Sequence, residues 1–450
     1  MKFGGTSVGS AERIEGVAER VRERLELRPV VVTSAVSGIT DLLIRGARLA
    51  LARDPAAEAV PDELLGRHRD LLAQLFPSGD VRDRLELHVA RIIGELRTIY
   101  TGVHALEELT PRSLDAVSAM GERLSYVIVA AVLERQGLRA EAVDARNVIV
   151  TDDTFGRALP LAIETEARVK SVVRPLVEAG VVPVLGGFIA STRDGVTTTL
   201  GRGGSDWSAA IIGAHLAADE IQIWTDVDGM LTVDPRTVPA ARHIAEVSFE
   251  EAAELAYFGA KVLHPATIKP AVEKGIPVRI LNSLNPAAPG TRIAAASASA
   301  SGEPRAIAFK RGISVVLISQ PRMLMAHGFL ARVFEVFDRH RTPVDLIATS
   351  EVSISLTVDD PARLPAIEAD LAPLGEVQVL RPMAIVSVVG RGFARQSGVA
   401  ARIFAALREV NIVMISFGAS DVNVSMAVAA EDAERAVRLL HKTFFEGDTI

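Results

Sequence analysis

Two short stretches of the chain combine glycines with charged side chains, as anion-binding loops do. Residues 2–7 read KFGGTS, and residues 201–206 read GRGGSD. Glycines let backbone N–H groups approach an anion closely, and Lys2 adds a positive point charge that suits a phosphate. Arg202 offers a planar pair of donors that suits a carboxylate. The alternative for each stretch is an ordinary turn, followed in the second case by a helix cap.

Polar residues also follow two predicted strands. Thr225 and Asp226 end the apolar run IQIWTD, and further acids follow as far as Asp234. Because the ligand order of an EF-hand is absent, a loop beside a nucleotide fits this segment better than a calcium loop. The strand PVVVT leads into SAVSGIT, residues 34–40. Its hydroxyl groups suit a small polar substrate and equally suit an ordinary strand-to-helix turn.

Three further residues are weak candidates when taken alone. Lys261 follows a helix predicted to begin at the capping residue Ser248, and a lysine at a helix end more often stabilises the helix dipole than takes part in catalysis. Glu122 lies on an otherwise apolar helical face, where a lone glutamate is most often half exposed. His264 is interpreted as structural, because no paired-histidine spacing typical of a metal site occurs in the chain.

The composition limits the possible function classes. The 450 residues suffice for two or three domains of about 150 residues each. A formal net charge of -7 argues against a general affinity for nucleic acid or anionic membranes. The absence of cysteine excludes disulfides, thiolate metal sites and a cysteine nucleophile. No apolar run approaches the roughly 18 residues of a spanning helix, so we expect a soluble, cytoplasmic protein.

Strands and helices are predicted to alternate through the first two thirds of the chain. Apolar residues recur at helical spacing from Ser10 to Leu27, and again from Leu114 to Gly137. Between them, residues 40–110 are predicted to form a helical layer that breaks at prolines 55, 61 and 77. Short β-branched runs such as VVPVLGGFIA and IPVRILNS follow. This order predicts an α/β fold with a mainly parallel sheet, helices on both faces, and ligands at the carboxyl ends of the strands.

A second region follows a small, polar, proline-terminated linker at residues 295–305. There the order strand-helix-strand-strand-helix-strand occurs twice, at about 313–381 and 384–450. The second copy lacks its closing strand, which residues 306–311 are expected to supply. The sequence therefore predicts one large domain at residues 1–294 and two interlocked βαββαβ modules at 306–450.

Four local motifs together resemble the aspartate kinases of the amino-acid kinase family. They are KFGGTS, TTTLGRGGSD, WTDVDG with DPR, and FGAKVLHPAT, and they occur in the family order over nearly the whole chain. FLARVFEVFDRHRTPVDLIATSEVSISLT and NIVMISFGASDVNVSMAV look like the two ACT modules of these enzymes, most like the lysine-sensitive monofunctional type. In this family a strand precedes the KFGG loop. Because only Met1 precedes Lys2 here, we expect this strand to be absent, which could impair catalysis by this chain.

The resemblance implies an activity and the residues for it. ATP would phosphorylate the β-carboxylate of L-aspartate, giving 4-phospho-L-aspartate, the first step of lysine, threonine and methionine biosynthesis. Mg²⁺ would be held mainly by the nucleotide phosphates, with no protein metal site. The catalytic residues would be Lys2, Asp206 and Lys261. The nucleotide would contact Lys2, Gly4, Gly5, Thr6, Thr225, Asp226, Leu231, Arg236, Lys261 and Val262. Aspartate would contact Ser34, Thr40, Glu122, Phe188, Arg202, Gly203, Gly204 and Ser205.

The resemblance also implies feedback inhibition at an interface between subunits of a homodimer or a dimer of dimers. The matching positions are Met323, Gly328, Phe329, Leu330, Val344, Asp345, Ser350 and Glu351. Two acids suit a ligand with two ammonium groups, so we expect L-lysine rather than threonine, unless both acids are solvated strand-end residues. Alternative functions are a kinase for glutamate or acetylglutamate and a non-catalytic amino-acid sensor. A P-loop ATPase is excluded, because the motif G-x4-G-K-[ST] is missing.

Overall fold

The computed structural model describes residues 1–258, 265–295, 302–320 and 327–447. Lys261, Val262, His264 and Met323, which the sequence analysis singled out, lie outside these ranges. The described residues form two compact units. The first unit comprises residues 1–229 and 265–295, and the second comprises residues 230–258 and the described residues from 302 onward.

A mainly parallel sheet runs through the first unit, in the strand order β13-β12-β8-β1-β2-β5-β3. All neighbours pair in parallel except β13, which is antiparallel to β12. The strands are β1 (Lys2–Phe3), β2 (Val31–Thr33), β3 (Ala140–Val143), β5 (Val182–Gly186), β8 (Ile221–Thr225), β12 (Val278–Asn282) and β13 (Thr291–Ala294). Buried β-branched side chains dominate these strands, as expected where helices cover both faces.

The expectation that the first strand is absent is wrong. Lys2–Phe3 form β1 at the middle of the sheet, where Lys2 pairs with Val32 of β2 and with Ile223 of β8. Two residues suffice because a central strand finds ladder partners on both sides. The ring of Phe3 is fully buried and stacks on Trp224, with 5.8 Å between ring centroids. The KFGG turn therefore begins at the end of a strand.

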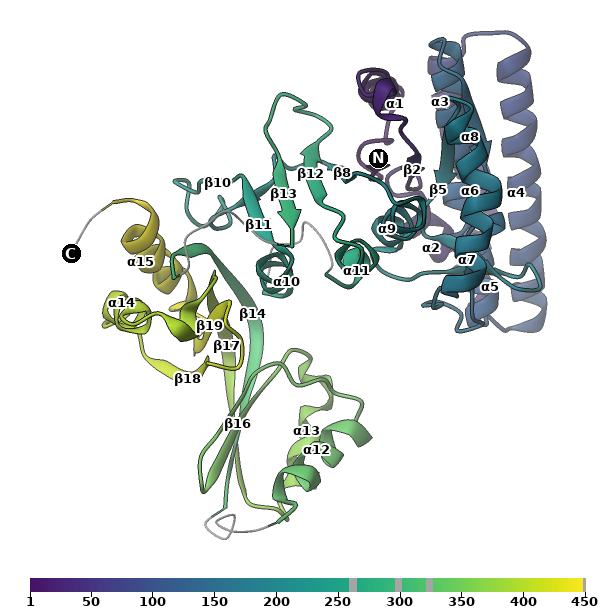
Figure 1. The fold of residues 1–450 in the computed structure, drawn as a ribbon. Coiled ribbons are helices and arrows are strands. Elements are labelled where there is room, and N and C mark those ends of the chain that lie inside the picture. The colour runs from purple at the N-terminus through teal and green to yellow at the C-terminus, as the bar shows by residue number, and fades with distance from the viewer. Residues whose placement is uncertain (259–264, 296–301, 321–326, 448–450) are drawn as a thin grey trace. The chain divides into compact units, whose positions relative to one another are not determined.

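Helices flank this sheet (Figure 1). They are α1 (Ala11–Arg22), α2 (Ile39–Leu51), α3 (Ala59–Leu75), α4 (Asp80–Leu106), α5 (Pro111–Ser118), α6 (Met120–Arg135), α7 (Ala162–Arg168), α8 (Arg174–Glu178), α9 (Gly204–Leu216) and α11 (Lys269–Glu273). Ser10 caps α1, as its position in the sequence predicts. The expected break at Pro61 is wrong, because this proline lies in the first turn of α3. A first-turn N–H has no partner within the helix, so proline is tolerated there.

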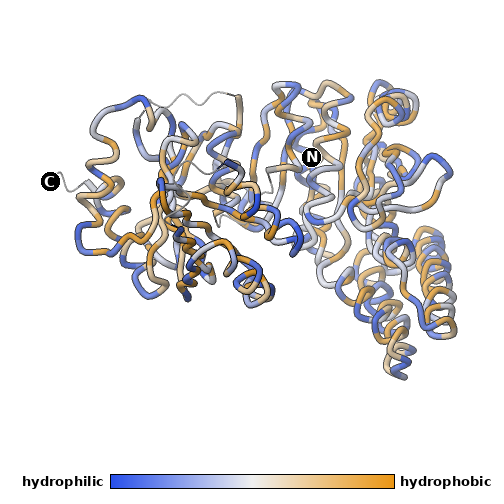
Figure 2. Tube along the Cα trace, turned by 90° about the horizontal axis from the view of Figure 1, so that it is seen from below, coloured by the Kyte–Doolittle hydropathy of each residue, from blue (hydrophilic) through white to orange (hydrophobic). Residues whose placement is uncertain are grey.

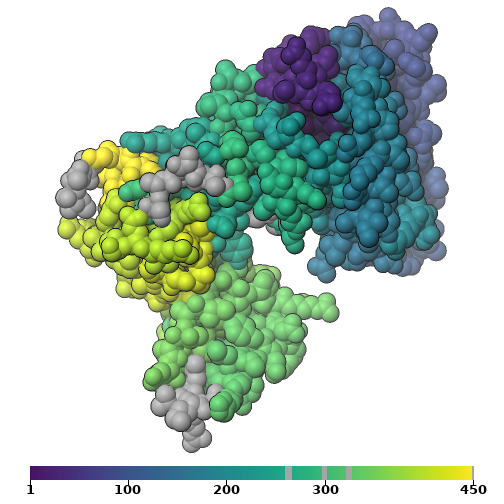
Figure 3. All heavy atoms as spheres, in the orientation of Figure 1, coloured from purple at the N-terminus to yellow at the C-terminus, as the bar shows by residue number. Residues whose placement is uncertain are grey.

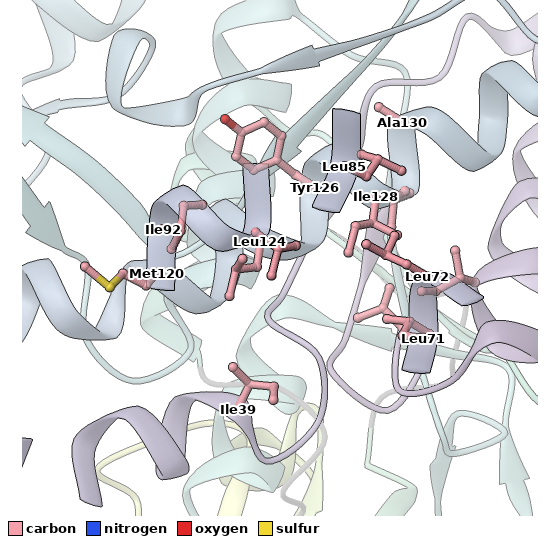
Figure 4. Packing of buried hydrophobic residues seen from close by; sticks show 14 of the residues in the cluster. Ile39, Leu71, Leu72, Leu85, Ile92, Met120, Leu124, Tyr126, Ile128 and Ala130 are labelled. Atoms are coloured by element: carbon pink, nitrogen blue, oxygen red, sulfur yellow. The ribbon is translucent and has the colours of Figure 1, made fainter. Parts of the chain in front are cut away.

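The helices α3, α4 and α6 lie side by side and enclose an extensive apolar core (Figure 1). Figure 4 shows Leu72 of α3, Leu85 of α4 and Ile128 of α6 lying close together in this core. The stretch Pro111–Arg135 is long and apolar enough to cross a membrane, but 89% of its apolar window is buried inside the protein. Orange and blue alternate along the helices in Figure 2, as expected for amphipathic helices.

A smaller sheet supports the glycine-rich loop. It has the order β4-β6-β7 and consists of β4 (Val150–Thr151), β6 (Ile189–Thr192) and β7 (Thr197–Thr199). Strands β6 and β7 form a hairpin whose turn contains Asp194 and Gly195, and Gly195 has a φ of +77°. The loop that contains Arg202 follows β7 directly.

The second unit contains a sheet of the order β15-β16-β14-β17-β19-β18. The strands of this sheet and the helices between them are β14 (Pro304–Ser319), α12 (Phe329–Arg339), β15 (Ile347–Thr349), β16 (Ser353–Val358), α13 (Leu364–Leu371), β17 (Glu376–Gly390), α14 (Val399–Ala406), β18 (Ile412–Phe417) and β19 (Asn423–Ala429), followed by the helix α15 (Ala433–Phe445). The long strands β14 and β17 pass through both expected modules. Residues 306–311 pair with residues 384–389, which is where we expect the strand after the linker to close the second module.

In Figure 3 the two modules form adjoining lobes, the first in green and the second in yellow-green to yellow. Residues 230–258 also belong to this unit, as β9 (Met230–Leu231), β10 (His243–Ile244), β11 (Glu246–Ser248) and α10 (Phe249–Tyr257). Ile307 of β14 donates its N–H to the Thr232 carbonyl at 2.7 Å, and Val233 and Val238 join the core of α14 and α15. Residues 230–258 come before residue 294, where we expect the boundary between the two domains. That boundary stays a prediction.

Candidate active site

A pocket of about 590 Å³ lies at the carboxyl ends of β1, β2 and β8 in the first unit. Its lining includes fifteen of the site residues expected from the sequence, namely Lys2, Gly4, Gly5, Thr6, Ser34, Thr40, Glu122, Phe188, Arg202, Gly203, Gly204, Ser205, Asp206, Thr225 and Asp226. These residues come from six separate chain segments. Their convergence at this end of the strands agrees with the rule that open α/β sheets bind ligands there.

Several lining residues were missed by the sequence analysis, namely Ala35, Val36, Ser37, Gly38, Asp41 and Gly201. Five of them belong to or adjoin the SAVSGIT segment, and Gly201 begins the GRGGSD segment. The sequence therefore contained a signal for these residues, since they are neighbours of predicted site residues and a loop that lines a pocket does so with consecutive residues.

Lys2 and Asp206 form an ion pair inside the pocket. Lys2 Nζ lies 2.8 Å from Asp206 Oδ1, and the two side chains are only 11% and 14% exposed. Lys2 belongs to β1, whereas Asp206 lies in the first turn of α9, where the helix dipole stabilises an anion. The pair holds the lysine ammonium at the pocket wall, because an unpaired charge at this depth would be costly.

The glycines after Lys2 bring the backbone close to its neighbours. Gly4 donates its N–H to the Trp224 carbonyl at 3.1 Å. A Cβ atom on Gly5 would lie 3.0 Å from the carbonyl oxygen of Ala35, and one on Gly4 would lie 3.6 Å from Lys2 Nζ. Side chains here would crowd the space beside the lysine, so the segment fits a cradle for the phosphates of a nucleotide.

The GRGGSD segment turns sharply before α9 begins. Gly201 and Gly203 have φ angles of +77° and +73°, which other residues rarely adopt. A Cβ atom on Gly204 would lie 2.8 Å from a ring carbon of Phe188. Arg202 stands between these glycines with an exposed side chain, and within the described part of the chain it has no hydrogen-bond or ion-pair partner. Its guanidinium group is thus available to an anion in the pocket.

Glu122 is 3% exposed, which contradicts the half-exposed position expected for a lone glutamate. Its Oε1 accepts the N–H of Ala35 at 3.1 Å, whereas its Oε2 is buried and has no hydrogen-bond partner among the described residues. Burial raises the pKa of Glu122 to about 8, although the Ala35 N–H and the charge of Lys2 both act to lower it. A cation beside Oε2 would stabilise the charged form.

Hydrogen bonds join the loops around Glu122. Ser34 donates its hydroxyl to Ser205 Oγ at 3.0 Å, and Ser125 of α6 donates its hydroxyl to the Ser34 carbonyl at 2.8 Å. Phe188 has a positive φ of +67° and donates its N–H to Ser208 Oγ at 2.9 Å. The loops after β2, β5 and β7 therefore meet in one hydrogen-bonded frame.

The residues expected on the nucleotide side are divided between the two units. Thr225 and Asp226 line the pocket, and the neighbouring Asp228 accepts from the side-chain amides of Asn282 at 2.7 Å and Asn285 at 3.0 Å. Leu231 and Arg236 belong to the second unit. Arg236 is paired with Asp234 through Nε at 3.0 Å and Nη2 at 2.6 Å. No group of three or more potential metal ligands occurs among the described residues.

The expected effector residues lie on separate elements of the second unit. Gly328 caps the N-terminus of α12 with a φ of +76°, followed by the buried Phe329 and the exposed Leu330. Val344 is half buried and packs against the core of α12 and α13. Ser350 forms a 2.7 Å hydroxyl pair with Ser353, and Glu351 is exposed.

Asp345 is half buried and already has a partner. Its Oδ1 accepts a hydrogen bond from the hydroxyl of Tyr257, the last residue of α10. Burial and the adjacent carboxylate of Asp359 raise the pKa of Asp345 above its usual range. Asp345 is therefore not the fully solvated strand-end acid that was the alternative expectation.

Comparison with known proteins extends over the whole chain. Residues 1–282 match the amino acid kinase family, and residues 386–444 match the ACT domain. The chain is 39% identical to "Aspartokinase 3, chloroplastic" of Arabidopsis thaliana, over 100% of this chain and 82% of that protein. It is 37% identical to "Lysine-sensitive aspartokinase 3" of Escherichia coli, over 99% of this chain and 98% of that protein.

Solved structures agree with these sequence matches. The structure of E. coli aspartokinase III in complex with lysine and aspartate is similar at a TM-score of 0.83 and 36% identity, covering 99% of this chain and 98% of that one. The same protein in complex with aspartate and ADP gives the same TM-score and identity, with 99% of both chains covered.

Proposed function

Since this chain belongs to the aspartokinases of the amino acid kinase family, we propose that it transfers the γ-phosphoryl group of ATP to the β-carboxylate of L-aspartate. The products are ADP and 4-phospho-L-aspartate. The observation that carries this proposal is the convergence of Lys2, Asp206, Arg202 and Glu122 in one pocket, where Glu122 Oε2 has no hydrogen-bond partner among the described residues. In this pocket Lys2 offers a cation to phosphates, and Arg202 and Glu122 offer one charge of each sign to a free amino acid.

The reaction needs no general base, because the attacking carboxylate is already ionised at neutral pH. A β-carboxylate oxygen forms a bond to the γ-phosphorus while the bond to the bridging oxygen of ADP breaks. ATP supplies the phosphoryl group, and Mg²⁺ would be held mainly by its phosphates. The task of the chain is to gather anions and to neutralise the charge that develops during transfer. Lys2 serves this task, Asp206 fixes its position, and Gly5 presents its backbone N–H group, whereas the N–H of Gly4 fixes the turn by bonding to the Trp224 carbonyl.

We assign the recognition of aspartate to Arg202 and Glu122. Arg202 binds the α-carboxylate, because its planar donors match a carboxylate in a bidentate manner. Glu122 receives the α-ammonium at Oε2, which lacks a hydrogen bond in the described part of the chain and whose charge a cation would stabilise. A free amino group then becomes a requirement for substrates, which separates aspartate from acetylated amino acids. Lys261, Thr225 and Asp226 complete the nucleotide side in this proposal, together with Leu231, Arg236 and Val262.

A coupled assay of ADP release tests this function with L-aspartate, L-glutamate, N-acetyl-L-aspartate and N-acetyl-L-glutamate. We expect turnover of L-aspartate only. Equal turnover of aspartate and N-acetyl-aspartate would refute the role of Glu122, and a preference for L-glutamate would refute the substrate.

We further propose that L-lysine inhibits the kinase at the C-terminal modules of a homodimer or a dimer of dimers. Asp345 and Glu351 supply two anions for the two ammonium groups of lysine, whereas threonine would leave one acid unpaired. The test is activity at saturating aspartate with millimolar lysine, threonine or both, repeated with Glu351→Ala. Inhibition by threonine alone, or lysine inhibition that the substitution leaves unchanged, would contradict this assignment.

A further inference from the structure

Asp115 is a buried carboxylate that the proposed reaction does not use. It lies on α5 and is 3% exposed. Its Oδ2 accepts the backbone N–H groups of Gly156 and Thr199, each at 2.9 Å, and its Oδ1 accepts the Thr199 hydroxyl at 2.7 Å. Three donors on one buried carboxylate satisfy its charge without a cation. Asp115 therefore joins a helix, a loop and a strand end.

Both partners of Asp115 support the loop of Arg202. Thr199 is the last residue of β7, three positions before Arg202. Its carbonyl also accepts the N–H of Ala158 at 2.9 Å, so the strand end is held from two sides. Gly156 lies behind Gly201, because a Cβ atom on Gly201 would be only 3.1 Å from the Gly156 carbonyl oxygen. The loop that carries Arg202 therefore begins at a strand end that Asp115 and Ala158 hold in place.

The same helical stretch positions the other substrate loop. Glu122 follows Asp115 by seven residues, which is about two helical turns and returns to the same face. Its Oε1 accepts the N–H of Ala35 in the loop after β2. Along Pro111–Arg135, one carboxylate thus accepts a backbone N–H from a loop that lines the pocket, and the other accepts the N–H of Thr199, the strand residue just before the loop of Arg202.

We propose that Asp115 is a positioning residue for aspartate binding, acting through Thr199 on the backbone that carries Arg202. This inference rests on the proposed function, in which Arg202 binds the α-carboxylate of the substrate. Asp115 touches neither the phosphate loop nor Lys2 through any described hydrogen bond or ion pair, so its effect should fall on aspartate and not on ATP.

Substitutions at Thr199 test the proposal without removing the buried charge. Thr199→Val deletes the hydroxyl that binds Asp115 Oδ1 at nearly constant volume, and Thr199→Ser keeps it. The matched control is Thr198→Val, because Thr198 is equally buried on the same strand and its hydroxyl bonds instead to Thr151 Oγ1 at 2.7 Å. We expect Thr199→Val to raise the KM for aspartate by about tenfold, the effect of one lost hydrogen bond to a charged group.

In all of these variants the KM for ATP should stay within about twofold of its value in the unaltered protein. Thr199→Ser should also keep the aspartate KM of the unaltered protein. Thr198→Val should lower the melting temperature by as much as Thr199→Val but leave the KM for aspartate unchanged. The inference is refuted if the two valine variants change the aspartate KM equally, or if Thr199→Val changes only the melting temperature.

A double-mutant cycle separates this inference from the proposed function. If Arg202→Ala leaves the KM for aspartate unchanged, the assignment of Arg202 fails, and the inference fails with it. If Arg202→Ala raises that KM, Thr199→Val should add no further increase in the Arg202→Ala background, because it acts through the arginine. An undiminished, additive effect of Thr199→Val would leave the proposed function intact and refute the positioning role.

Discussion

The residues expected to bind the substrate and those expected to bind the effector differ in how the chain has arranged them. In the first unit, side chains from six segments converge on one pocket, and Glu122 Oε2 and Arg202 lack partners among the described residues. In the second unit, Asp345 is bonded to Tyr257 and Ser350 to Ser353. A single chain thus presents the first site ready for a ligand, whereas at the second an effector that binds Asp345 Oδ1 must displace the hydroxyl of Tyr257. The other oxygen of this carboxylate, Oδ2, is buried and has no hydrogen-bond partner among the described residues.

This difference has an energetic consequence. A preorganised site uses the binding energy of its ligand for affinity or catalysis, whereas a site already engaged loses part of that energy to break the existing bond. Substitutions in the first unit should therefore weaken the function that they touch. A substitution that removes the internal partner in the second unit should strengthen binding of the effector.

The largest effect should come from Lys2→Met. This substitution keeps the length and apolar stem of the side chain but removes the charge that faces the transferred group. We expect kcat to fall by about 10²- to 10³-fold, the cost of losing one preorganised electrostatic donor. Steady-state rates of ADP release at saturating ATP and aspartate measure this.

Lys170→Met is the matched control for Lys2→Met, because Lys170 forms an ion pair with Glu166 at 2.6 Å on the exposed surface of the same unit. It should leave kcat unchanged. A change in KM for ATP without any loss of kcat in Lys2→Met would show that Lys2 acts in ground-state binding only.

The next effect concerns Glu122→Gln, which we expect to raise the KM for aspartate about 10- to 100-fold through loss of a charge-assisted hydrogen bond. Without substrate, the same substitution should stabilise the folded protein at high pH. The folded pKa is raised from 4.5 to about 8, so the stability that Glu122 contributes is present below pH 4.5 and is lost as the pH rises through 8. At pH 8, Glu122→Gln should therefore melt at a higher temperature than the unaltered protein.

Thermal melts between pH 5 and 9 check the stability effect of Glu122→Gln. Glu134→Gln on the exposed face of the same helix serves as the control and should follow the unaltered protein at every pH. If Glu122→Gln shows the same pH dependence as this control, Glu122 is ionised in the free protein, and the contrast with the second unit is weaker than we describe.

The smallest effect should come from Tyr257→Phe, which removes the hydroxyl that occupies Asp345 Oδ1. We expect the concentration of lysine that halves the activity to fall several-fold, because about 1 kcal/mol of internal bonding no longer opposes the effector. The kcat without lysine should stay the same. Tyr100→Phe is the control, since it removes a buried hydroxyl bonded to the Leu43 carbonyl at 2.7 Å in the first unit. Weaker inhibition in Tyr257→Phe would mean that the tyrosine helps to form the effector site.

The sequence predicted the loops of the pocket because their signals are local. A strand followed by small polar residues marks a loop at the carboxyl end of a parallel sheet, and this pattern located residues 34–40 and 201–206. Glu122 required the family resemblance, because a lone acid on an apolar face does not reveal whether it is buried. Asp115 was missed, although its spacing of seven residues from Glu122 is a usable signal.

Other features depend on packing between distant segments. Arg236 lies in the second unit because Val233 and Val238 pack against α14 and α15, about 200 residues later in the chain. The bond between Tyr257 and Asp345 joins residues 88 positions apart. Neither position follows from periodicity or turn residues, which report only the nearest few residues. The first strand was expected to be absent because only Met1 precedes Lys2, whereas the pairing of Lys2–Phe3 with β2 and β8 makes these residues a strand.

The most direct test of the central claim is the number of protons released when L-aspartate binds to the free protein at pH 7. Titration calorimetry in two buffers of different ionisation enthalpy gives this number. Since the pKa of Glu122 is about 8 before binding and the α-ammonium requires its charged form, we expect release of close to one proton by the unaltered protein and none by Glu122→Gln. Binding of aspartate without proton release in the unaltered protein would contradict the account.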